Sequence, residues 1–137
     1  MARIGYINKD THASRTLEIF NGHRDEFVKF ACGKLSEGLS SGDARGCLVK
    51  EVKSDMENAI FRHLKHTGAV RGEYRHQYYC GFYRTVRREP QKSDVPSDLL
   101  DVETIFPNFS ELVDAMMVDA GKLRLVSEIE RIKNEKS

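Results

Sequence analysis

Apolar residues recur at three- and four-residue spacing in two adjacent stretches of the chain, a pattern that predicts two amphipathic helices. The first helix is expected over 23–39 and the second over 44–66. Between them, Ser40 and Asp43 are residue types that cap helix N-termini, and Gly68 suits the left-handed residue that closes a helix. The apolar positions are Phe27, Val28, Ala31, Leu35 and Leu39 in the first helix, and Leu48, Val49, Val52, Met56, Ala59, Ile60 and Leu64 in the second.

Short apolar and alternating patterns predict β-strands at two places. Residues 3–8 and 14–20 are β-branched or aromatic segments separated by a polar turn, which is typical of a hairpin. Residues 72–88 alternate with period two, so one face of that strand is expected to be mostly apolar and the other wet. Gly81 interrupts this run: a bulge there keeps one strand, whereas a turn there makes a hairpin.

The C-terminal third reads as a loop followed by helices. The loop covers 89–96, and a short helix is predicted over 97–106. A capping-box pattern beginning at Asn108 precedes a further amphipathic helix, which Gly121 is expected to end. Residues 122–126 fit either more helix or a strand, and we favour helix.

Together these elements predict the fold class. At 137 residues and 15.7 kDa the chain fits one domain, long enough to bury about two thirds of the surface of the unfolded chain. We expect a single α+β domain over 1–137 whose last few residues are frayed. A small antiparallel sheet, built from the N-terminal hairpin and the strand near 70–88, is expected to pack against the two amphipathic helices, with further C-terminal helices completing the core.

Charge and cysteine content indicate an intracellular protein. The formal net charge is +1, so the molecule as a whole is not drawn to polyanions. The sequence contains neither a signal-peptide pattern nor an apolar stretch of membrane-spanning length, and we expect no membrane partner. An odd number of widely spaced cysteines, Cys32, Cys47 and Cys80, fits reduced and mostly buried thiols.

Charges are strongly segregated along the chain. Residues 62–92 carry eight Lys or Arg against two acids, whereas 93–121 carry seven acids and no Lys or Arg. The two blocks either face one another across the fold or lie on solvated surfaces, or they form the halves of a docking surface. The residues proposed for an acidic docking face are Asp98, Asp101, Asp114 and Asp119.

The aromatic and basic strand is the candidate binding element. Tyr and Arg are enriched at the energetic centres of protein interfaces, and the same residue types stack on unpaired bases and neutralise phosphates. A structural strand with solvated arginines is the plain alternative. The predicted partner-binding residues are Arg71, Arg75, Tyr79, Tyr83, Arg87 and Arg88.

Catalytic, metal and cofactor signatures are weak. On one strand, His76 and Cys80 would lie ~13 Å apart, too far for proton transfer. His63 and His66 share a helix face but lack the companions of a zinc site, so capping of the helix C-terminus explains them better. No phosphate-binding loop is present. We therefore predict no cofactor, no metal and no catalytic residue.

The predicted function is a non-catalytic, intracellular regulatory or inhibitory binding protein that docks a protein partner. A module that binds single-stranded nucleic acid through the same strand is the alternative, and a Cys/His-dependent enzyme is a distant third.

Overall fold

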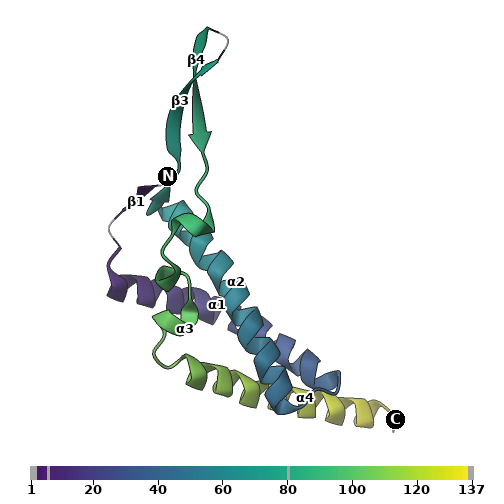
Figure 1. Cartoon of the computed structure of the whole chain (residues 1–137). Helices are drawn as coiled ribbons and strands as arrows, with labels where there is room; N and C mark the ends of the chain where they lie inside the picture. The colour runs from purple at the N-terminus through teal and green to yellow at the C-terminus, as the bar shows by residue number, and fades with distance from the viewer. Residues whose placement is uncertain (1–2, 6, 80, 136–137) are drawn as a thin grey trace.

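Three long helices form the body of the molecule, and a β-hairpin projects from it (Figure 1). The computed structural model describes residues 3–5, 7–79 and 81–135. It describes the backbone alone for strand residues 3–4, 73–79 and 82–87 and for residue 135. The long helices are α1 (Lys9–Ser36), α2 (Ser41–Thr67) and α4 (Phe109–Glu135). The shorter elements are β1 (Arg3–Ile4), β2 (Val70–Arg71), β3 (Glu73–Tyr79), β4 (Phe82–Arg88), the 3-10 turns η1 (Lys92–Asp94) and η2 (Ser97–Leu99), and α3 (Val102–Ile105).

Helix α1 takes the place of the predicted N-terminal hairpin. Residues 9–36 form one continuous helix, so the strand predicted over 14–20 is wrong, and the helix predicted over 23–39 begins fourteen residues too late. Asn8 caps α1, because its side-chain oxygen accepts a hydrogen bond of 3.1 Å from the backbone N–H of Thr11.

Polar residues on the buried face of α1 explain this error. The buried stripe begins with His12 and Thr16 and reaches Phe20 four residues later. Both polar side chains are satisfied inside the fold: His12 Nε2 lies 2.8 Å from the carbonyl oxygen of Leu99, and the Thr16 hydroxyl donates to the His12 carbonyl at 2.7 Å. Since neither residue is apolar, the helical period is invisible in this part of the sequence, and the β-branched and aromatic residues resemble a strand.

Helix α2 confirms the helix predicted over 44–66 and extends it by three residues at its start and one at its end. Ser40 accepts a hydrogen bond of 3.2 Å from the backbone N–H of Asp43, and Gly68 closes the helix with φ +77°. Tertiary packing and both end signals therefore favour the same boundaries. The fully or nearly buried side chains of α2 are Ala44, Leu48, Val52, Met56, Ala59, Ile60, Phe61 and Leu64.

The predicted antiparallel sheet is wrong, and the described chain is mainly helical rather than α+β. The strands form two separate pairs: β1 pairs with β2, and β3 pairs with β4. Gly81, at φ +84°, lies between β3 and β4, so the run over 72–88 folds back on itself as a hairpin. With 14–20 helical and 72–88 turned back, the described strands form only these two-stranded pairs and do not join into one sheet over the two helices.

The C-terminal part alternates short turns with one long helix. The predicted helix over 97–106 is interrupted, since η2 ends at Leu99 and α3 begins at Val102 behind the capping side chain of Asp101. Helix α4 continues through Gly121, so the predicted end there is wrong. The preference for helix over 122–126 is confirmed.

One cluster of buried side chains joins the helices. Helix α1 packs extensively against both α2 and α4, and Val95, Leu100, Val102 and Phe106 from the connecting segment join the same cluster. No helix in the described part of the chain has both the length and the apolar character that crossing a membrane requires.

Candidate partner-binding hairpin

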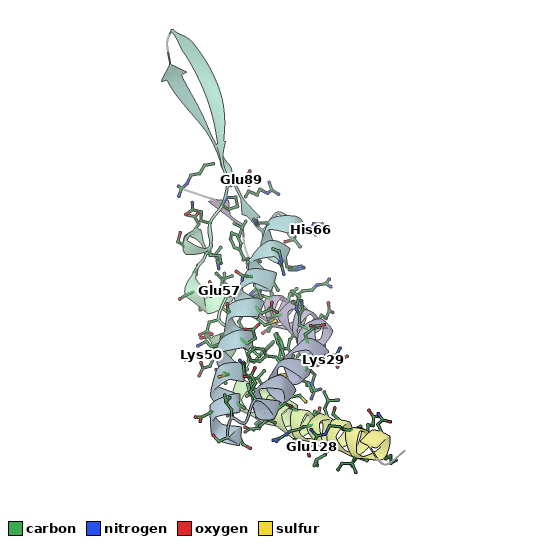
Figure 2. All side chains as sticks on the ribbon, turned by 90° about the vertical axis from the view of Figure 1, so that its right-hand side faces the viewer. Lys29, Lys50, Glu57, His66, Glu89 and Glu128 are labelled. Atoms are coloured by element: carbon green, nitrogen blue, oxygen red, sulfur yellow. The ribbon has the colours of Figure 1, made fainter. Side chains whose placement is uncertain are left out.

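Strands β3 and β4 form an arm, which we define as residues 73–88. Both views show it extending away from the body beyond the end of α2 (Figures 1 and 2). Figure 2 labels Glu89 at the base of the arm and His66 near the end of the helix. Within the described residues, each strand contacts the other extensively and no helix contacts either strand to a similar extent. The arm therefore lacks the covering layer that sheets in globular proteins normally have.

The first end of the arm is fixed to the body through β2. Val70 is buried, and its backbone pairs with Ile4 of β1. Arg71 follows at the surface, where its Nε donates to the carbonyl oxygen of Gly68 at 2.9 Å. Gly72 then leads directly into β3.

The second end returns to the C-terminal half of α2. Arg88 Nη2 lies 3.6 Å from Asp94 Oδ1, and Pro90 is buried. Lys92 Nζ donates to Asn58 Oδ1 of α2 at 2.7 Å and lies 3.6 Å from the Glu57 carboxylate. Both ends of the arm are thus held on the body, although the arm itself is not covered by it.

The pairing register sorts the arm positions into two faces. Glu73 opposes Arg88 and Tyr79 opposes Phe82. Opposed residues of an antiparallel pair share a face, and the faces alternate along each strand. We call these the tyrosine face and the mixed face. The tyrosine face comprises positions Tyr74, His76, Tyr78, Tyr83, Thr85 and Arg87, and the mixed face comprises Glu73, Arg75, Gln77, Tyr79, Phe82, Arg84, Val86 and Arg88.

The predicted binding residues are therefore divided rather than gathered on one strand face. Tyr83 and Arg87 belong by register to the tyrosine face, whereas Arg75 and Tyr79 belong to the mixed face. Arg71 and Arg88 lie at the base of the arm, and each has an intramolecular partner. The turn at Gly81 causes the division, because it reverses the parity of the positions that follow it.

The predicted acidic docking face is largely engaged within the body. Asp114 Oδ1 lies 2.8 Å from Arg45 Nε, and Asp119 Oδ2 lies 2.6 Å from Arg24 Nη2. These two pairs connect α4 to α2 and to α1, respectively. Asp98 is exposed on η2.

Lys53 of α2 contacts Asp101, which belongs to the predicted acidic docking face, and the nearby Glu103. Its Nζ lies 3.6 Å from Asp101 Oδ1 and 3.0 Å from Glu103 Oε2. The hydrogen bond to Glu103 and the negative charge of Asp101 raise the pKa of Lys53 above its ordinary value of 10.5. The acids at 101 and 103 therefore connect the α3 segment to α2.

Cys32 and Cys47 are free and half-buried, whereas the pairing of His76 with Cys80 falls outside the described residues. Over the described ranges, no cluster of three or more His, Cys, Asp or Glu could hold a metal ion.

A hollow between α1 and α2 is a feature that sequence reasoning missed. His23 Nδ1 lies 3.0 Å from Asp55 Oδ2, and the His23 ring stacks on Phe27 at 6.2 Å. The hollow has a volume of about 610 Å³, and its described lining contains no Ser, Thr or Cys that could act as a nucleophile beside the histidine. Because the two residues of the pair lie on different helices, no local sequence pattern indicates their contact.

Comparison of the chain with protein-family models, with curated proteins and with solved structures finds no match. Inference about function therefore rests on the arm and the body themselves.

Proposed function

We propose that the protein is a non-catalytic binding protein of the regulatory or inhibitory kind, and that its arm docks onto a protein partner. The observation that carries this proposal is the exposed position of the arm: a two-stranded ribbon held at its base and covered by no other layer of the described structure. An isolated two-stranded hairpin has marginal stability in water. A partner that supplies the missing layer would stabilise it.

The residue types of the arm fit such a role. Its tyrosine face carries three tyrosines, one histidine and one arginine but no acid. Tyrosine offers a large contact area with few rotatable bonds and a hydroxyl for hydrogen bonding, and with arginine it dominates the binding energy of protein interfaces. We assign most of the binding energy to the tyrosine face. The acidic segment is not part of this proposal, because Asp101, Asp114 and Asp119 have partners within the body.

Single-stranded nucleic acid is the second candidate, and the charge of the arm favours it. Residues 73–88 carry four arginines against one acid, Glu73. Aromatic and cationic residues on an exposed ribbon can stack on bases and neutralise phosphates. Such binding would weaken steeply as the salt concentration rises.

Affinity capture from a lysate, followed by mass spectrometry, tests the proposal with two matched variants of the full chain. The first variant is Tyr78→Ala/Tyr83→Ala, a directly opposed pair on the tyrosine face. The second is Tyr79→Ala/Phe82→Ala, the neighbouring opposed pair on the mixed face. Each variant removes one cross-strand aromatic pair, so any loss of hairpin stability is comparable. We expect the first to lower capture of the partner at least about tenfold, and the second to lower it much less.

Two results would contradict the proposal. If neither variant changes the set of captured proteins, the arm does not dock the partner. If nuclease treatment removes the captured proteins and the purified chain binds a single-stranded oligonucleotide at low salt, the nucleic-acid alternative is correct.

A further inference from the structure

The far end of the molecule carries a second uncovered surface, on helix α4. In Figures 1 and 2 the C-terminal end of α4 extends past the other helices, and Figure 2 labels Glu128 on the C-terminal part of α4. Five large apolar side chains of α4 have exposed fractions between 46% and 59%, and Leu123 is 38% exposed. Four of the five, Val118, Leu125, Ile129 and Ile132, share one side of the helix, and we call them the α4 stripe. The fifth, Val126, lies about 90° around the helix from this stripe.

The α4 stripe lies on the opposite side of the helix from the core. The core-facing residues of α4 are Phe109, Val113, Met116 and Ala120. At about 100° per residue, the stripe positions cluster roughly 160° away from them. A helix in a globular protein ordinarily shows one apolar face. The second face on α4 is therefore not explained by the packing of its own chain.

The spacing of this second face is that of a coiled-coil seam. Val118, Leu125 and Ile132 are seven residues apart, and Lys122 and Ile129 lie four residues after the first two. In heptad terms, 118, 125 and 132 are d positions and 122 and 129 are a positions. In the middle of the seam, Ile129 at a and Leu125 at d are the combination that favours two-stranded assembly, whereas the outer d positions, Val118 and Ile132, are β-branched.

We infer that a second copy of this chain covers the α4 stripe in a parallel two-helix coiled coil. The charges beside the seam favour a second copy of the chain in the parallel orientation. Glu128 is at a g position and the exposed Lys133 at an e position, five residues later. In a parallel pair each Glu128 lies beside Lys133 of the other copy, which gives two symmetric attractions. In an antiparallel pair centred on this seam the two Glu128 residues meet and repel.

Two further features agree with a parallel pair. Lys122 is a single polar residue at an a position, which costs stability but fixes the register of the two helices. Glu128 lies 3.4 Å from Arg124 of its own helix and is still about half exposed, so it is accessible to the second copy. Asp114 and Asp119, which flank the seam nearer the body, are each neutralised by an arginine of their own chain.

Sedimentation equilibrium of the full chain tests whether it self-associates through the α4 stripe. We expect a concentration-dependent dimer that Ile129→Asp abolishes, while helical content stays unchanged because the side chain is exposed in the single chain. The matched control is Leu17→Asp, which places the same charge at an exposed apolar position of α1 and should leave the dimer intact. A wild-type chain that stays monomeric to about 1 mM overturns the inference, as does a dimer that Ile129→Asp leaves intact.

A charge swap tests the orientation. Glu128→Lys should weaken the parallel dimer roughly tenfold, because both attractions become repulsions. Adding Lys133→Glu should restore it. Glu130→Lys makes the same change of charge away from the seam and should have little effect. Failure of the double swap to restore association overturns the parallel arrangement, since an antiparallel pair does not bring 128 beside 133.

Discussion

The arm and the helical body use different aromatic residues. Of seven phenylalanines, all but Phe82 lie outside the arm, whereas four of five tyrosines lie within it. In the body, Phe20 is buried with its ring 6.0 Å from that of Phe27 and 5.9 Å from that of Phe106. Phenylalanine has no polar atom to satisfy in a core, and tyrosine suits a surface that meets both water and a partner. Phenylalanine is therefore used in the helical body, which maintains the fold, and tyrosine in the arm, which we propose binds the protein partner.

The strongest test of this contrast removes one aromatic side chain from each region. Phe20→Ala should lower the free energy of unfolding of the body by about 3–5 kcal/mol, because it leaves a cavity at the centre of the core. Tyr83→Ala should change it by less than about 1 kcal/mol, because the arm adds nothing to that core. Urea unfolding followed by circular dichroism measures both. Equal losses in the two variants would show that the arm and the body unfold as one unit.

A smaller effect is expected at the surface contact between α2 and the α3 segment. The pKa of Lys53 is raised above 10.5 in the folded chain by Glu103 and then Asp101. The stability from this contact is therefore fully present below pH 10.5 and is lost as the pH rises through the higher, folded pKa. In the Lys53→Met variant, the part of the stability loss at alkaline pH that comes from this contact should disappear. The Lys50→Met variant, changed on the same helix, should still show it. Unfolding midpoints measured between pH 9 and pH 12 compare the three proteins, and identical pH profiles would contradict the assignment.

The smallest effect on stability is expected from removing the arm. Replacing residues 74–87 by two glycines should change the free energy of unfolding by less than about 0.5 kcal/mol, because Glu73 and Arg88 are already neighbours in the register. Thermal unfolding by circular dichroism measures this, and capture of the partner should be lost in the same variant. A loss of several kcal/mol would mean that the arm is part of the body after all.

The parts of the fold that the sequence predicts well are those where every local signal agrees. Helix α2 has an apolar stripe, an N-cap at Ser40 and a closing glycine at Gly68, and its predicted limits are close to the observed ones. The Phe27, Ala31 and Leu35 stripe of α1 is likewise buried as predicted. In these regions the period of apolar residues, the end signals and the packing all require the same structure.

The predictions that are wrong depend on tertiary contacts. The buried His12 is acceptable in the core because Leu99, 87 residues away, provides its hydrogen-bond acceptor, and no local pattern indicates that pairing. The arm shows a related problem. The alternation with period two correctly indicates extended backbone over 73–79 and 82–88. The two faces depend on whether the chain bends or reverses at Gly81, and the observed reversal separates Arg75 and Tyr79 from Tyr83 and Arg87. The roles of these residues stay predictions until binding is measured.

The geometry of the arm also makes its reach adjustable in steps. Because both strands are anchored at one end of the body, inserting one residue into each strand moves the tip outward by about 3.4 Å and leaves the base unchanged. One such insertion exchanges the two faces beyond it, whereas two insertions in each strand restore them. A lineage carrying this arm could therefore lengthen it to reach a more distant partner, provided that each strand grows by an even number of residues.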